Sequence, residues 1–285
     1  MKKLKRKLNF DVCTFCNHKC TFCSNPDQRT IKSQVTLDQY IDVMDNVMRY
    51  IIIDEIGLSA KGEVLVNKDL SSIIKTTKDR YNIPYIYISS NGALMDRDRS
   101  IELIESGLDS TKFSINAVDK QSYHKVHQSD DFDIVIQNLK DLIDLKRTKY
   151  PTHKIFLSSV ISMDEDLLKD KFKNILGEDY FSYIDGISVF QLTYTSKFET
   201  IESDKKITKG CKIPFTEIYI NSDCSLGLCC KDYFDEINFG SLLTNDFLKL
   251  YKGKAYEDIR QMHIDKVFPN NHLCKNCLLF DNGEH

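Results

Sequence analysis

The sequence predicts an α/β fold built around a parallel β-sheet, followed by a smaller cysteine-bearing domain. Two observations carry this prediction. Short runs rich in Ile, Val, Tyr and Phe alternate with stretches of helical periodicity over residues 1–195. Beyond residue 210 this alternation stops and cysteines cluster. A chain of 285 residues is long enough for one large domain and a small appendage.

Six strands and the helices between them follow from the spacing of apolar residues. The expected strands are short and nearly continuously apolar, as buried parallel strands are. They lie at 7–12, 51–58, 85–89, 111–116, 154–161 and 184–192. Helical periodicity is present at about 36–50, 68–80, 98–106, 131–148 and 165–176. Six βα units in series predict either an open sheet or a partial barrel.

The polar segment 196–210 has no periodicity and is the predicted linker between two domains, 1–195 and 211–285. Past the linker, the apolar runs 215–221 and 225–230 flank a Ser-Asp pair and predict a β-hairpin. A helix is expected at about 244–262, ahead of a distal Cys-x2-Cys pair. The second domain is therefore a hairpin, a helix and cysteines.

Composition is that of an ordinary soluble protein. Charged residues make up 28% of the chain, and the formal net charge is −3. No stretch approaches the roughly 18 to 20 apolar residues of a membrane span. The basic N-terminus lacks the apolar region of a signal peptide, and we interpret it as a solvated end rather than a phosphate-binding arm. We expect a cytoplasmic protein with no nucleic-acid or membrane partner.

Ten cysteines in such a chain indicate metal binding, because reducing compartments keep thiols free of disulfides. Four of them lie in CTFCNHKCTFC, residues 13–23. All four could surround zinc, although zinc sites usually separate their ligand pairs by a longer loop. Alternatively, Cys16, Cys20 and Cys23 form the site, while Cys13 ends a strand and points into the core. Three thiolates leave one iron of a cubane cluster open, whereas closed electron-transfer clusters take four cysteines.

The spacing Cys16-x3-Cys20-x2-Cys23, with the aromatic Phe22 before the last cysteine, resembles the signature of the radical S-adenosylmethionine (SAM) enzymes. The resemblance implies a partial (β/α)6 TIM-like barrel with its active site at the carboxyl ends of the strands. It also implies that these cysteines hold a [4Fe–4S] cluster whose open iron binds SAM. One electron cleaves SAM to methionine and a 5′-deoxyadenosyl radical, which removes a hydrogen atom from the substrate.

Later segments resemble the same family in the expected order: KGEVLVNKDL after the second strand, SSNG after the third and KFSINA on the fourth. The resemblance implies these SAM-binding residues: Phe22, Gly62, Glu63, Asn91, Ser114 and Asn116. In QSYHKVHQ, His127 and Gln128 stand where the family often has Arg-Gly. Either His127 or Lys125 replaces the cation for the SAM carboxylate, or the two form a solvated surface pair. His18, inside the cysteine loop, is expected to be a surface spacer.

The C-terminal cysteines resemble the auxiliary-cluster domain of the same superfamily, called SPASM in its full form and Twitch in its shorter one. The resemblance implies one closed auxiliary [4Fe–4S] cluster with these ligands: Cys211, Cys229, Cys274 and Cys277. Cys230 is the alternative to Cys229, because neighbouring residues of a strand face opposite ways. Cys224 stands where the family usually has a turn glycine. Zinc held by the same thiolates is the competing interpretation.

A layout with one auxiliary cluster is most similar to the radical SAM dehydrogenases that act on 2-deoxy-scyllo-inosamine. The similarity implies oxidation of a secondary alcohol of a sugar or aminocyclitol to a ketone. The auxiliary cluster would accept an electron, and flavodoxin or ferredoxin would be a suitable reductant. Modification of a ribosomally made peptide (crosslinking, epimerisation or formylglycine formation) is one alternative, and a non-enzymatic iron–sulfur or zinc module is another. The sequence assigns no catalytic base.

Overall fold

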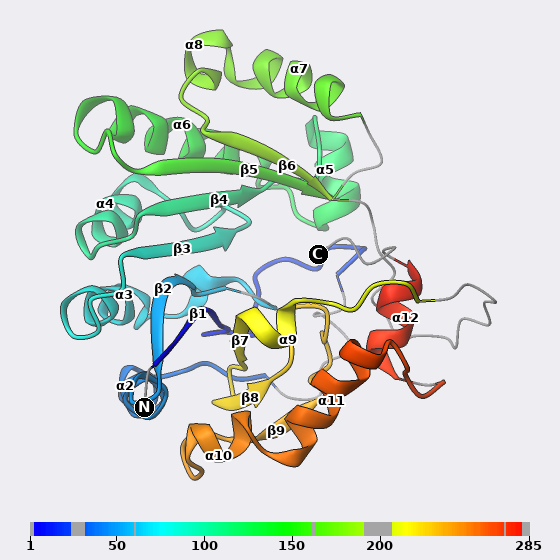
Figure 1. Cartoon of the computed structure of the whole chain (residues 1–285). Coiled ribbons are helices and arrows are strands. Elements are labelled where there is room, and N and C mark those ends of the chain that lie inside the picture. Colours follow the sequence, from blue (N-terminus) through cyan, green and yellow to red (C-terminus); the bar gives the residue numbers. More distant parts are fainter. Residues whose placement is uncertain are drawn as a thin grey trace.

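One mixed β-sheet runs through the protein, with helices stacked along it (Figure 1). The computed structural model describes residues 3–23, 32–59, 61–160, 164–190, 207–270 and 272–280. The strand order is β6-β5-β4-β3-β2-β1-β7-β8-β9. Neighbours from β6 to β1 pair in parallel, and the sheet does not close on itself. The predicted α/β fold with a partial barrel is confirmed.

The strands of the barrel lie close to their predicted positions. They are β1 (Leu4–Phe10), β2 (Ile51–Gly57), β3 (Tyr85–Ser90), β4 (Ser110–Ser114), β5 (Lys154–Val160) and β6 (Gly186–Phe190). The first strand begins earlier than expected, because its polar first half still pairs with β2. The predicted ends at 161 and at 191–192 fall outside the described residues.

Helices alternate with these strands as predicted. They are α2 (Leu37–Met48), the 3-10 turn η1 (Val64–Val66), α3 (Leu70–Asp79), α4 (Arg97–Glu105), α5 (Lys120–His127), α6 (Phe132–Thr148), α7 (Glu165–Leu176) and α8 (Glu178–Phe181). Local sequence sets their starts: Thr36 forms a capping box with Gln39, and Asp119 forms one with Ser122. Helices α2, α3, α4 and α6 stand side by side in the order of their strands (Figure 1).

The two faces of the sheet differ in chemistry, because successive side chains of a strand point to opposite faces. One face packs under the helices and is apolar; Leu8, Phe10, Ile56, Ile86 and Ile88 on it are fully buried. The intervening side chains, such as Lys7 and Glu55, are polar and form the inner face of the partial barrel. The helices therefore stabilise the outside of the sheet and leave the inside to polar contacts.

The C-terminal part extends the same sheet, which the sequence analysis did not foresee. Strand β7 (Glu217–Ile220) pairs in parallel with β1, and β8 (Ser225–Gly227) and β9 (Asn238–Ser241) follow in antiparallel order. The predicted hairpin is therefore confirmed, while β9 was missed. Cys224 adopts a left-handed φ of 63° in the turn, so it takes the conformation that glycine would. Most of the predicted linker lies outside the described residues.

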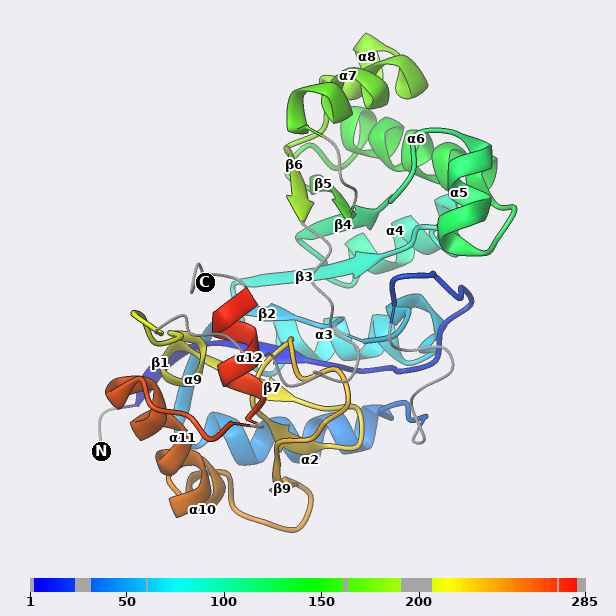
Figure 2. The same cartoon turned by 90° about the vertical axis from the view of Figure 1, so that its right-hand side faces the viewer.

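The described residues of this part also form the helices α9 (Ile213–Thr216), α10 (Phe247–Tyr251), α11 (Lys254–Asp265) and α12 (Leu273–Phe280). The helical stretch predicted at about 244–262 is present, but it is divided into two helices, because α10 ends at Tyr251 and α11 starts anew after its N-cap, Gly253. Both views show α9 to α12 gathered around β7, away from α7 and α8 (Figures 1 and 2). The distal Cys-x2-Cys pair lies on α12.

Buried polar contacts join the C-terminal part to the barrel. Lys61, which is 7% exposed, bonds to Asp235 and to Asn221. The hydroxyls of Ser33 and Ser222 lie 2.5 Å apart. Because Lys61 directly precedes Gly62, the loop after β2 is anchored to the auxiliary domain on one side.

Candidate active site and auxiliary metal centre

The cysteine loop follows β1 at the carboxyl edge of the parallel strands. In it, Cys16 and Cys23 are exposed and Cys20 is half-buried. Cys13 differs, because it is only 2% exposed and its thiol lies 3.7 Å from the carbonyl oxygen of Phe15. This environment supports the interpretation of Cys13 as a bystander.

The thiols of Cys16, Cys20 and Cys23 interact electrostatically. Burial, and then the charges of Cys23 and Cys16, raise the pKa of Cys20 to about 12. Three thiols that repel one another as thiolates need a cation between them, and iron binding displaces their protons. The donor set therefore fits three irons of a [4Fe–4S] cluster, with the fourth iron open to SAM.

Gly62 packs directly against this loop. A Cβ atom at this position would lie 2.3 Å from the carbonyl oxygen of Cys13. This distance is too short for any side chain, so only glycine fits here. The next residue, Glu63, donates its backbone N–H to the carbonyl oxygen of Phe15 at 2.8 Å. The glycine thus allows the loop after β2 to hold the start of the cysteine loop through the backbone.

The carboxylate of Glu63 connects the loops after β2 and β3. It is 2% exposed and accepts hydrogen bonds from the Ser90 hydroxyl (2.8 Å), the Asn91 N–H (2.8 Å) and the Leu65 N–H (3.1 Å). Burial raises the pKa of Glu63, against the effect of these donors. The side chain of Asn91 then donates to the Asn17 side chain at 2.8 Å, inside the cysteine loop. Glu63 and Asn91 therefore both hold the cysteine loop in place, and their contact with SAM stays a prediction.

Replacing Glu63 with Gln should destabilise this junction. The NH₂ group of the glutamine would replace one of the two carboxylate oxygens that now accept hydrogen bonds. At least one buried donor would then face another donor and lose its acceptor. We expect the free energy of unfolding in urea to fall by about 1–3 kcal/mol. The matched control is Glu105→Gln, an exposed glutamate of α4 paired with Lys149, which should leave that free energy unchanged. Equal stability of both variants would contradict the bracing role of Glu63.

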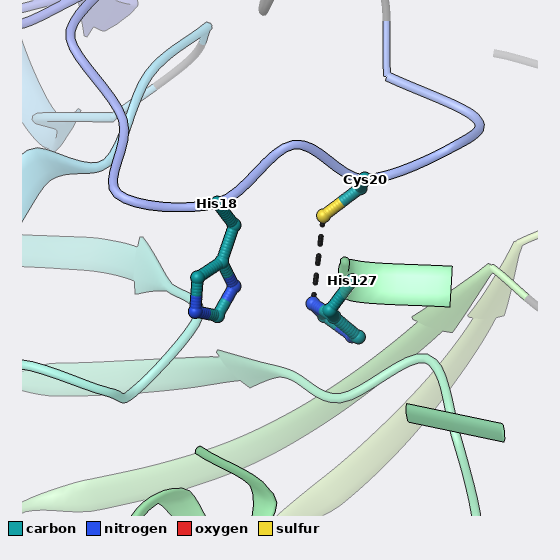
Figure 3. Close-up of side chains that lie close together, drawn as sticks. All are labelled: His18, Cys20 and His127. Carbon is teal, nitrogen blue, oxygen red and sulfur yellow. Dashed lines mark hydrogen bonds between the residues drawn. The ribbon is translucent and has the colours of Figure 1, made fainter. Parts of the chain in front are cut away.

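His127 points at the cluster loop (Figure 3). Its Nδ1 lies 3.4 Å from Sγ of Cys20, and its Nε2 accepts the backbone N–H of Asn116 at 3.2 Å. Since Nε2 is an acceptor, the proton of the neutral ring is on Nδ1, which donates to the sulfur. Burial and the nearby His18 lower the pKa of His127 to about 4. The ring is 1% exposed and stacks on Tyr123 at 4.2 Å.

The interpretation of His127 as a solvated surface residue was therefore wrong. Periodicity could not reveal this, because α5 carries two histidines and one lysine in its last turn, and only tertiary contacts decide which of them is buried. The backbone of α5 also binds the loop: the Thr21 N–H donates to the Val126 carbonyl at 2.9 Å. Gln128 ends the helix with a left-handed φ of 54°, where glycine is the usual residue.

His18 was wrongly expected to be a surface spacer. It is 3% exposed, and its Nε2 lies 2.9 Å from a carboxylate oxygen of Asp131 at the start of α6. His18, Cys20 and His127 have ligand atoms within 4.8 Å of one another, a group that could hold a metal ion (Figure 3). With Nε2 accepting from Asn116, however, His127 presents a proton rather than a lone pair to Cys20. We therefore interpret this group as the support of a cluster ligand.

The remaining predicted SAM-binding residues lie at the same edge of the sheet. Phe22 is half-buried in the cysteine loop. Ser114 is the last residue of β4, and its hydroxyl lies 3.2 Å from that of Ser158 on β5. Asn116 is 5% exposed and accepts the N–H of Val160 at 2.7 Å. Asn116 thus joins β5 to His127, so that it supports the cysteine loop from behind.

A second site lies between α9, α11 and α12. One pocket there is lined by all four predicted auxiliary ligands, namely Cys211, Cys229, Cys274 and Cys277. Most of its other wall is apolar, including Ile213, Leu228 and Leu273. Burial, and then the charges of Cys277 and Cys211, raise the pKa of Cys274. Four mutually repelling thiols in an apolar pocket fit a closed cluster with four thiolate ligands.

The neighbouring residues Cys229 and Cys230 have different surroundings. Cys229 lines the pocket, and the described lining does not include Cys230. Instead, burial and then the charge of Cys230 raise the pKa of Tyr219 on β7, which places this thiol beside the inner face of the barrel. The arrangement favours Cys229 as the ligand.

The inner face of the barrel forms a connected polar surface. Lys7 pairs with Glu55 at 2.9 Å and lies over the Tyr87 ring. The Tyr87 hydroxyl donates to the side chain of Asn9 (3.1 Å), which donates to Glu217 on β7 (2.8 Å). A Cβ atom on the adjacent Gly57 would meet the Tyr87 ring at 2.5 Å, so glycine makes room for it. A polar substrate would find both donors and acceptors on this face.

No helix in the described ranges is long and apolar enough to cross a membrane.

Comparison with curated proteins finds partial relatives. A GTP 3′,8-cyclase of Chlorobaculum tepidum is 26% identical over 136 residues, which cover 46% of this chain and 39% of that protein. A probable GTP 3′,8-cyclase of Methanocaldococcus jannaschii is 24% identical over 164 residues, which cover 58% of this chain and 54% of that protein. The chain thus matches about half or less of the length of these relatives.

Solved structures share the fold over most of the chain. BtrN in complex with AdoMet and 2-DOIA has a TM-score of 0.62 at 15% identity, covering 97% of this chain and 94% of that chain. SuiB of Streptococcus suis bound to the precursor peptide SuiA has a TM-score of 0.70 at 13% identity, covering 90% and 67%. At these identities the likeness establishes the fold alone.

Family comparison covers both sites. Residues 211–278 match SPASM, an iron–sulfur cluster-binding domain. Residues 11–167, more than half of the chain, match the radical SAM superfamily. These two domains imply a SAM-binding [4Fe–4S] cluster, auxiliary iron–sulfur binding and SAM as cofactors. Together with the cysteine loop at the carboxyl edge of the parallel strands, this match establishes that the chain belongs to the radical SAM superfamily.

Proposed function

We propose that this protein is a radical SAM dehydrogenase that oxidises a secondary alcohol of a sugar or an aminocyclitol to a ketone. The observation that carries the proposal is the pocket in which four thiols, of Cys211, Cys229, Cys274 and Cys277, lie together. A cluster with four protein ligands has no iron open to a substrate, so its use is the transfer of electrons. A reaction whose last step releases an electron needs such an acceptor.

The proposed reaction balances without an external oxidant. When bound, SAM and the clusters supply a 5′-deoxyadenosyl radical and an electron acceptor. Removal of the hydrogen atom from the carbinol carbon leaves a ketyl radical, which loses its hydroxyl proton to a base and one electron to become the ketone. In sum, SAM and the alcohol give methionine, 5′-deoxyadenosine, the ketone and a proton. A reductant such as flavodoxin or ferredoxin primes the first turnover.

The inner face of the barrel supports a small polar substrate. This surface presents a charged amine, an amide, carboxylates and a phenol, from the side chains of Lys7, Asn9, Glu55, Tyr87 and Glu217. Hydroxyl and amino groups of a sugar or aminocyclitol both donate and accept hydrogen bonds, which such a mixed surface can satisfy. The structural match to BtrN, solved with the small molecule 2-DOIA, covers almost all of both chains and supports the same class of substrate.

Two other reactions have support of their own. The relatives named GTP 3′,8-cyclase favour chemistry on a nucleotide, although they match only part of this chain. Burial and then the charge of Lys7 lower the pKa of Lys112, and two lysines on one face would suit a phosphorylated substrate. The structure of SuiB with its precursor peptide favours peptide modification.

Label transfer separates these reactions. The reconstituted protein is incubated anaerobically with SAM, a reductant and aminocyclitols or sugars that carry deuterium at each carbinol carbon in turn. We expect one deuterium in 5′-deoxyadenosine and a ketone product in equal amount. Deuterium arriving only from ribose-labelled GTP or from a labelled peptide would overturn the dehydrogenase proposal. The Cys16→Ala variant, which should form no 5′-deoxyadenosine, is the blank.

A further inference from the structure

His263, on α11, lies in the wall of the auxiliary pocket together with the four cysteines. It is 4% exposed. Its Nδ1 accepts the backbone N–H of Cys211 at 3.1 Å. Its Nε2 is buried and has no hydrogen-bond partner among the described residues. Sequence reasoning missed this residue, because His263 stands 52 positions from the cysteine that it contacts.

The contact with Cys211 fixes the tautomer of the ring. Nδ1 accepts a proton from the backbone, so the ring's own proton is on Nε2. Because a nitrogen that accepts a hydrogen bond carries no proton, the ring is neutral in this arrangement. The pocket wall therefore holds a buried N–H donor for which the described residues provide no acceptor. Buried donors of this kind are rare and are usually met by a bound group.

We propose that Nε2–H of His263 donates a hydrogen bond to a sulfur of the auxiliary cluster and raises its reduction potential. The cluster gains negative charge on reduction, and an N–H directed at its sulfur stabilises the reduced form more than the oxidised one. His263 is a positioning residue and not an iron ligand, because ligation through Nε2 would move its proton to Nδ1, against the Cys211 N–H. The proposal rests on the presence of the auxiliary cluster and holds for any substrate.

His272 provides a matched control. Its Nδ1 accepts the N–H of another predicted ligand, Cys274, at 3.1 Å, yet it is half-buried and does not belong to the described lining of the pocket. An asparagine oxygen can replace Nδ1 as the acceptor in either position. His263→Asn therefore removes only the Nε2 donor from the pocket, and His272→Asn makes the same change outside it.

The measurement is an anaerobic redox titration of the holoprotein, followed by EPR of the cluster whose signal SAM does not alter. We expect His263→Asn to weaken reduction of this cluster about tenfold, a potential lower by about 59 mV for one electron. His272→Asn should keep the wild-type potential. In His263→Gln the amide nitrogen reaches the position of Nε2. This variant should therefore recover most of the potential that His263→Asn loses.

Equal potentials of wild type and His263→Asn would overturn the proposal and leave Phe268, whose ring centroid lies 4.9 Å from that of His263, as the ring's neighbour. A second measurement does not depend on changing His263. In the His272→Asn protein labelled with ¹⁵N-histidine, pulsed EPR of the reduced auxiliary cluster should detect one weakly coupled nitrogen, and its absence would also overturn the proposal. Both measurements omit substrate, so their outcome is independent of the dehydrogenase test.

Discussion

Replacing Cys16, Cys20 or Cys23 with alanine is expected to remove the SAM-binding cluster and reduce 5′-deoxyadenosine formation to background. Each variant deletes one of three thiolates that share a loop and repel one another without iron. Loss of a residue that hydrogen-bonds to a metal ligand typically lowers metal affinity or activity about 10–100-fold. Loss of a ligand itself should therefore lower 5′-deoxyadenosine formation by more than about 100-fold. Iron and sulfide content, and chromatography of 5′-deoxyadenosine from anaerobic reactions, measure the two effects.

Cys13→Ala is the matched control within the same loop. Its thiol is buried and contacts a backbone carbonyl, so the variant should lose about 1 kcal/mol of stability but keep its iron and SAM cleavage. A Cys13→Ala protein that lost iron to the same extent as Cys16→Ala would show that four thiols form the site. That result would favour a closed metal centre over an open iron.

Cys229→Ala is expected to remove the auxiliary cluster, whereas Cys230→Ala should retain it. Cys229 lines the pocket with the other three ligands, while Cys230 lies beside Tyr219 on the barrel side. Because two [4Fe–4S] clusters hold about eight irons, Cys229→Ala should bind about four. Its 5′-deoxyadenosine formation should persist, with ketone formation reduced more than about 100-fold for want of an electron acceptor.

The neighbouring variant makes this test specific. Cys230→Ala should bind the full amount of iron, so any defect in it reports on the inner face rather than on the cluster. Loss of iron from Cys230→Ala and not from Cys229→Ala would reverse the assignment. Zinc without sulfide in a variant lacking Cys16, Cys20 and Cys23 would instead support a structural zinc site.

The order and type of the elements could be predicted from the sequence, because they depend on local patterns. The βα alternation located β1 to β6, and side-chain caps such as Thr36 and Asp164 set the helix starts. The same reasoning failed at Gly253, where a backbone break divides a stretch of continuous helical periodicity. It also missed β9, a short strand whose pairing with β8 is a matter of tertiary contact.

The sequence by itself determined where the cysteines cluster, in the first loop and in the C-terminal part, because these positions can be read directly along the chain. Which of the cysteines hold the clusters stays a prediction. The tertiary structure alone decided what surrounds them. His18 meets Asp131, His127 meets Cys20 and His263 meets Cys211, over separations of 113, 107 and 52 residues. Whether a histidine is solvated or buried against a cysteine depends on which elements pack together, and the parallel pairing of β1 with β7 is the contact that joins the two sites in one sheet.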